Sequence, residues 1–90
     1  MVDSNSLTGT IPNETVNLIS LQHLWLERNN FSGHLMPLSE LLELKVLHVH
    51  DNHFSGSVES ICPLFRLELI EFQADCGTIN GSCMSHIDCY

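Results

Sequence analysis

The chain has 90 residues, of which 43% are hydrophobic, and it carries three Lys and Arg residues against eleven Asp and Glu, a net charge of −8. This length allows one small domain, and the apolar content is sufficient for it to fold. The negative charge argues against nucleic acids and anionic membranes as partners, because their phosphates would be repelled.

Membrane insertion is not expected, because no run of about eighteen apolar residues occurs. Met1 is followed directly by Val2-Asp3-Ser4-Asn5-Ser6, with neither a basic nor an apolar leader region. We therefore expect any export signal to lie upstream of this segment.

An internal repeat organises the chain. The pattern Leu21-x-x-Leu24-x-Leu26-x-x-Asn29-x-Phe31-x-Gly33-x-Leu35 returns, at an offset of 23, as Leu44-x-x-Leu47-x-Val49-x-x-Asn52-x-Phe54-x-Gly56-x-Val58. Part of it precedes Leu21 at an offset of 24, and Leu67-x-x-Ile70-x-Phe72-x-x-Asp75 follows at 23. The predicted organisation is a partial repeat over 1–20, repeats over 21–43 and 44–66, a last strand over 67–75 and a cysteine-containing cap over 76–90.

Each unit is predicted to be a short strand, a turn and a loosely helical return that depends on its neighbours to cover its apolar side. The apolar residues expected to point inward from the strands are Leu24, Leu26, Leu47, Val49, Ile70 and Phe72. The return segments are expected to add Leu18, Leu38, Leu41, Ile61 and Leu64. The fold class predicted is an α/β repeat solenoid.

A ladder of polar side chains is expected where the chain turns off the sheet. Asn5, Asn29 and Asn52 occupy this place in successive units, and Asp75 occupies the last one. A buried amide there can bond backbone groups of its own coil and of the adjacent coil. We interpret these four residues as structural.

The sequence resembles a known repeat family at two places. Leu7-Thr8-Gly9-Thr10-Ile11-Pro12 and Asn29-Asn30-Phe31-Ser32-Gly33 are similar to the plant-specific class of leucine-rich repeat, although Met36-Pro37 and Val58-Glu59 depart from its Ile-Pro pair. The resemblance implies a right-handed superhelix with a concave parallel sheet and short helical, 3-10 or irregular convex segments. It also implies an extracellular receptor-like protein, a receptor-like kinase ectodomain or a secreted inhibitor.

Four cysteines lie in the final third of the chain, at Cys62, Cys76, Cys83 and Cys89. An even number in one cap predicts two disulfides, and the sequence leaves the three possible connectivities open. The resemblance implies that Cys62 is tied to the tail. A zinc site using His86 and the last three cysteines is the alternative.

Three acceptor sequons begin at Asn13, Asn30 and Asn80. Together with the expected disulfides they favour an extracellular or cell-surface location. Asn13 and Asn30 are expected off the concave sheet, so that glycans there would leave it open.

The concave face is the predicted site for a protein or peptide partner. In-register stacking at the offset of 23 places Trp25, His48 and Glu71 in one column and Glu27, His50 and Gln73 in the next, with Leu69 and Ala74 in flanking columns. An exposed Trp among polar groups is typical of binding hot spots. The predicted partner-binding residues are His23, Trp25, Glu27, Arg28, His48, His50, Asp51, Glu71 and Gln73.

Other functions are considered beside this one. A metal site or a pH response at His48 and His50 with Glu27 and Glu71 is another hypothesis. No catalytic motif occurs, so we expect no enzyme, no cofactor and no resident metal. A structural terminal cap that contacts only upstream repeats, or a zinc-capped intracellular scaffold, remain alternatives.

Overall fold

The computed structural model describes residues 8–90, and within this range every regular element is a short strand or a 3-10 helix. Asn5, expected in the polar ladder, lies outside the described residues. The strands are β1 (Thr8–Thr10), β2 (His23–Trp25), β3 (Asn30–Gly33), β4 (Val46–His48), β5 (His53–Phe54), β6 (Gly56–Ser57), β7 (Glu71–Ala74), β8 (Ile79–Asn80) and β9 (Asp88–Cys89). The 3-10 helices are η1 (Asn13–Asn17), η2 (Met36–Leu38), η3 (Cys62–Arg66), η4 (Cys76–Thr78) and η5 (Met84–His86).

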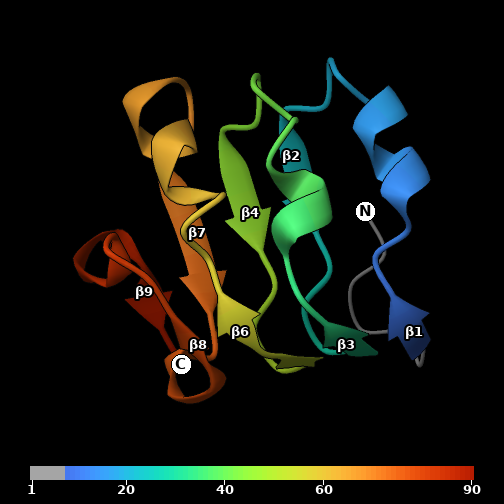
Figure 1. Cartoon of the computed structure of the whole chain (residues 1–90), viewed down its shortest axis with the longest axis vertical. Coiled ribbons are helices and arrows are strands. Elements are labelled where there is room, and N and C mark those ends of the chain that lie inside the picture. Colours follow the sequence, from blue (N-terminus) through green and yellow to red (C-terminus); the bar gives the residue numbers. More distant parts are fainter. Residues whose placement is uncertain (1–7) are drawn as a thin grey trace.

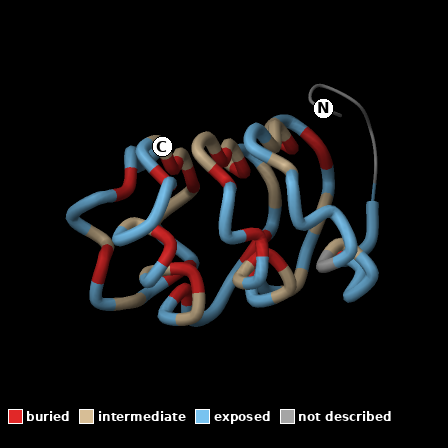
Figure 2. The backbone as a smooth tube through the Cα atoms, turned by 90° about the horizontal axis from the view of Figure 1, so that it is seen from above, coloured by how far each residue is buried: buried red, intermediate tan, exposed pale blue. Residues whose placement is uncertain are grey.

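All strand pairs in this range are parallel, and the strands form three sheets. The main sheet has the order β2-β4-β7-β9, a second has the order β1-β3-β5, and β6 pairs with β8. Figure 1 shows β2, β4 and β7 side by side, and Figure 2 shows from above how successive coils lie next to one another. Parallel sheets built from strands one coil apart fit a repeat fold.

The first three return segments are 3-10 helices because each is too short for a stable α-helix and begins beside a proline. Pro12 precedes η1, and Pro37 and Pro63 are the second residues of η2 and η3. Proline fixes φ near the helical value and lacks the N–H that a first turn leaves unbonded. Each proline therefore favours the start of a short helical turn at this place.

The core lies between the strands and these return segments. Leu24 pairs with Leu47 at the expected offset of 23, and Leu47 is fully buried. The buried hydrophobic side chains are Ile11, Leu26, Leu35, Leu38, Leu41, Leu44, Leu47, Val49, Phe54, Val58, Ile61, Leu64, Leu69, Phe72, Ala74, Ile79, Cys83 and Ile87. Leu18, which was expected among them, is exposed.

The last strand of the repeat region is not in the predicted register. Leu47 pairs with Phe72 at an offset of 25, whereas the sequence pattern placed Ile70 there. Ile70 is accordingly 79% exposed, while Leu69, which was expected to face solvent, is only 2% exposed. Ala74 is also buried rather than exposed. The prediction was wrong because Leu69-x-x-Phe72-x-Ala74 is an apolar pattern as acceptable as Leu67-x-x-Ile70-x-Phe72.

The extra two residues are accommodated between Leu64 and Leu69. In the preceding coil the equivalent buried pair, Leu41 and Leu44, is three residues apart rather than five. The offset returns to 23 at the next pairing, where Gly56 lies opposite Ile79. The chain therefore gains two residues before β7 and loses two after it.

The second sheet also departs from the sequence alignment. Gly9 lies opposite Phe31 rather than opposite the aligned Gly33. Gly33 has a φ of +85°, and a Cβ added to it would lie 3.0 Å from Cγ2 of Thr10. A glycine at this place thus permits both the left-handed conformation and the close approach of β1.

The polar ladder residues bond the backbone at the turn that follows each main-sheet strand. Asn29 is buried, and its Nδ2 donates to the carbonyl oxygen of Leu26 at 3.1 Å. Asn52 Nδ2 donates to the carbonyl oxygens of Leu26 at 2.7 Å and Val49 at 3.2 Å, and its Oδ1 accepts from Phe31 N at 3.0 Å. One amide therefore ties its own coil to the preceding coil.

Asp75 repeats part of this arrangement in the last coil, because its Oδ2 accepts from the backbone N of Asn52 at 3.2 Å. Arg28 and Asp51, one residue before each ladder asparagine, both have a φ of +59°. A left-handed residue at this place turns the chain off the sheet. Ala74, which precedes Asp75, is instead the last residue of β7, in keeping with the shift of that strand.

Candidate functional site: a strip of aromatic rings on the main sheet

The outward face of the main sheet is built by residues that alternate with the buried ones. Leu24 and Leu47 point inward, so their neighbours Trp25 and His48 point outward, and these two lie opposite each other in the β2-β4 pair. Their ring centroids are 6.2 Å apart with an interplanar angle of 29°. His23, two residues before Trp25 on the same face, stacks on it at 6.0 Å.

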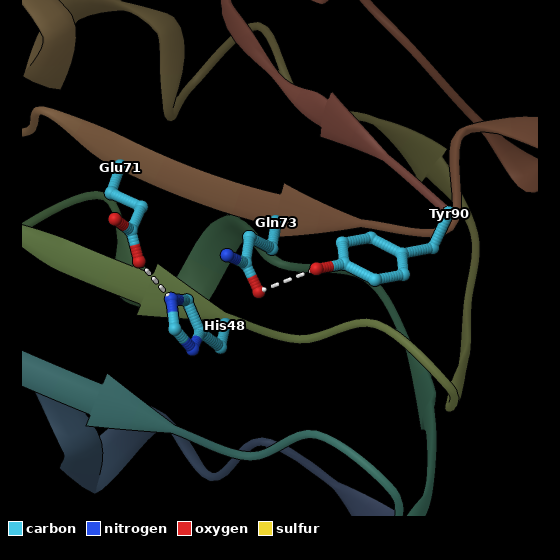
Figure 3. Close-up of polar contacts among 4 residues, drawn as sticks. All are labelled: His48, Glu71, Gln73 and Tyr90. Atoms are coloured by element: carbon cyan, nitrogen blue, oxygen red, sulfur yellow. Dashed lines mark hydrogen bonds and ion pairs between the residues drawn. The ribbon is translucent and has the colours of Figure 1, made fainter.

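The rings continue beyond the end of β4 toward β9. His48 lies 6.1 Å from His50, and His50 stacks on Tyr90 with centroids 3.9 Å apart and planes 9° from parallel. We call these five residues, His23, Trp25, His48, His50 and Tyr90, the ring strip. Tyr90 Oη also donates to Gln73 Oε1 at 3.2 Å, as Figure 3 shows.

Two carboxylates flank the ring strip. His48 Nε2 and Glu71 Oε2 are hydrogen-bond partners, and Figure 3 shows this contact between β4 and β7. The Glu71 side chain is 42% exposed, so this contact is open to water on one side. Glu27 lies on the same face as Trp25, two residues further along the chain, and is half-buried.

Three polar atoms on this face have almost no accessible surface and no hydrogen-bond partner within the described part of the chain. They are Nε1 of Trp25, Oε1 of Glu27 and Nδ1 of His50. Glu27 follows Trp25 by two residues on the same face. The backbone N of Arg28 donates to the carbonyl oxygen of His50, so Glu27 and His50 lie on adjacent segments of the chain. Covered polar groups without partners are unusual in folded proteins, and each calls for a group that completes its hydrogen bonding.

The structure corrects the predicted columns. Trp25 and His48 are neighbours as expected, but the third member of their row is Gln73, and Glu71 lies opposite Val46. Glu71 reaches His48 only diagonally, through its side chain. The sequence pattern placed Glu71 beside His48 and Gln73 beside His50. Because β7 is shifted by two residues, Glu71 lies opposite Val46 and Gln73 lies opposite His48.

The remaining predicted residues lie at the border of the face. Arg28 and Asp51 are exposed at the left-handed turn after the strands rather than within the ring strip.

Sequence reasoning missed Tyr90 altogether. The repeat pattern ends at Asp75, so nothing in the sequence indicated that β9 pairs with β7 and brings Tyr90 to this face.

The cysteines form two disulfides, as predicted: Cys62 with Cys83 and Cys76 with Cys89. The corresponding Cα atoms are 5.6 Å and 5.2 Å apart. The zinc alternative is therefore wrong, because the thiols it needs are oxidised. Elsewhere in residues 8–90 no group of three or more His, Cys, Asp or Glu side chains is arranged to hold a metal ion.

The disulfides have different structural roles. Cys62–Cys83 joins η3 to the cap, and Cys83 belongs to the core. Cys76–Cys89 ties the segment after β7 to β9, whose residues Asp88 and Cys89 pair with Gln73 and Ala74. Because Tyr90 follows Cys89 directly, this second bond places the last ring of the ring strip.

The three sequon asparagines are all exposed and lie away from the main sheet. Asn13 begins η1, Asn30 begins β3 in the second sheet, and Asn80 lies on β8. The Ser82 hydroxyl of the third sequon donates to Glu59 Oε2 at 2.9 Å. Nothing at these three positions overlaps the ring strip.

Comparison with known proteins identifies one repeat. Residues 20–41 match the Leucine Rich Repeat family. A leucine-rich repeat is present. It contains β2 and Trp25, and it suggests a protein-interaction module. No curated protein sequence matches the chain.

Two further observations bear on location. The two disulfides are consistent with an extracellular environment, where thiols are kept oxidised. No helix within residues 8–90 has both the length and the apolar character needed to cross a bilayer.

Proposed function

We propose that this chain is the recognition module of an extracellular leucine-rich-repeat protein and that it binds a protein or peptide on the outward, concave face of the main sheet. The observation that carries the proposal is the ring strip, in which Trp25 and its neighbours present stacked rings beside polar atoms without partners. Large rigid rings supply contact area at low entropic cost, and the polar atoms supply direction.

The proposed architecture is a right-handed solenoid of the plant-specific class, with repeats over residues 1–75 and a cap from Cys76 to Tyr90. Its support is the parallel pairing at one-coil offsets and the two disulfides in the cap. The proposed site comprises His23, Trp25, Glu27, Arg28, His48, His50, Asp51, Glu71 and Gln73, together with Tyr90. The proposed glycans at Asn13, Asn30 and Asn80 leave that face uncovered.

The test is a selection of random peptides displayed on yeast against the disulfide-bonded chain, after which each enriched peptide is measured against the unaltered chain and against Trp25→Ala. Enriched peptides should bind the Trp25→Ala variant about tenfold or more weakly, as expected for loss of an interface hot spot. Circular dichroism and thermal unfolding must show that the variant remains folded. His53→Ala is the matched control, because His53 is exposed on β5 in the second sheet.

The rival function is a structural cap that touches no ligand. In that case every enriched peptide would bind Trp25→Ala and His53→Ala as tightly as the unaltered chain. Loss of the cysteines would then impair stability without any binding defect to accompany it.

A further inference from the structure

The unpartnered atoms on the main sheet restrict the chemistry of what the ring strip can bind, and the inference drawn from them rests on the proposed function. Trp25 Nε1 is only a donor, whereas Glu27 Oε1 is only an acceptor when the carboxyl group is ionised. A ligand that satisfies both must therefore bring an acceptor and a donor to adjoining positions.

The donor for Glu27 is expected to be a cation. Glu71 already contacts His48, whereas Glu27 has an oxygen without a partner within the described residues. The net charge of −8 attracts positively charged groups and repels acidic ones over a longer range. A neutral donor would leave the Glu27 charge uncompensated within a half-buried position.

The rings beside Glu27 favour a planar cation. A guanidinium group stacks on aromatic faces, presents five donors and accepts no hydrogen bond, so it can lie against Trp25 while it donates to Glu27. Lysine ammonium also interacts with an indole face, but it does not stack and makes no paired contact with a carboxylate. The acceptor for Trp25 Nε1 is then a backbone carbonyl of the same ligand.

We propose that the ring strip binds an extended polypeptide through an arginine side chain, whose guanidinium lies against Trp25 and is neutralised by Glu27. The peptide backbone crosses the strands, and one of its carbonyl oxygens accepts from Trp25 Nε1. The unpartnered atoms have almost no accessible surface in the structure. Binding therefore involves changes of side-chain rotamer at the surface, which are common at interfaces.

Trp25 is the sole tryptophan of the chain, so its fluorescence reports on this site alone. The experiment uses the peptides enriched by the selection and compares each arginine peptide with its citrulline counterpart, which keeps the shape and removes the charge. Arginine peptides should bind about tenfold more tightly than citrulline peptides and should alter Trp25 emission.

Glu27→Gln should abolish that preference, because it removes the charge with little change of shape. The matched control is Glu43→Gln, which changes net charge equally in the exposed loop before β4 and should keep the preference. Folding and disulfide formation are checked for both variants.

The outcomes separate this proposal from the proposed function. Peptides whose binding depends on Trp25 but shows no preference for arginine would overturn the arginine assignment and leave the recognition function standing. An equal loss of preference in Glu27→Gln and Glu43→Gln would also overturn it, because it would show a general charge effect. Failure to obtain any Trp25-dependent peptide would overturn both proposals.

Discussion

The coils that contain β2 and β4 differ from the coil that contains β7 in how their register is determined. Between β2 and β4 the offset is the 23 of the sequence pattern, and neither disulfide joins one of these strands to the other. From β4 to β7 the offset is 25, and two disulfides link segments on either side of β7, Cys62 with Cys83 and Cys76 with Cys89. Apolar pattern alone therefore fixes register where one pattern is available, but not where two compete.

The largest expected effect tests the register of β7. Phe72→Ala should lower the free energy of unfolding by about 3–5 kcal/mol, because it empties a fully buried position. Ile70→Ala, at an exposed position, should change it by less than about 0.5 kcal/mol. Urea unfolding followed by circular dichroism measures both. Equal costs for the two variants would contradict the observed pairing of Phe72 with Leu47.

The next largest effect tests how much the two disulfides contribute to stability around β7. Replacing Cys62 and Cys83 together by Ser should lower the free energy of unfolding by about 2–4 kcal/mol, since it frees the unfolded chain and disturbs a core residue. Replacing Cys76 and Cys89 should cost slightly less, because the closed loop is shorter.

Hydrogen exchange locates these losses. After either replacement, protection should fall more at β7 and β9 than at β2 and β4, which lie further from the cap along the main sheet. Uniform loss over the whole chain would show instead that the cap and the repeats unfold as one unit.

The smallest effect concerns the ring that the cap adds to the binding face. Tyr90→Phe removes one exposed hydrogen bond to Gln73 and should cost less than about 1 kcal/mol of stability, with peptide affinity nearly unchanged. Tyr90→Ala also removes the stack on His50 and should weaken peptide binding measurably. Unchanged affinity in Tyr90→Ala would place the end of the site at His50.

Sequence reasoning identified the features that repeat. The pairing of Leu24 with Leu47, the neighbouring positions of Trp25 and His48 and the existence of two disulfides all follow from spacing or composition. The burial of Leu38, Leu41, Ile61 and Leu64 in the return segments follows from the spacing of the apolar residues. These features could be predicted because each depends on residues within one repeat or on its regular recurrence.

The features that sequence reasoning missed depend on choices between similar local patterns or on distant pairings. Leu67 and Leu69 are both leucines at plausible positions, and only packing of the whole coil selects Leu69 for the core. Tyr90 lies in a tail without periodicity, and its position on the face depends on the bond between Cys76 and Cys89. Neither choice is contained in a window of a few residues.

The two-residue shift of β7 has a consequence for how such a chain tolerates changes of length. Side chains alternate between the two sides of a strand, so a slip of two keeps Phe72 inside, whereas a slip of one would turn it to water and expose the core. Because β8 is back in phase with β6, the irregularity stays within a single turn of the chain. Paired insertions and deletions on either side of a strand are thus a way for neighbouring units to diverge in length without disturbing one another.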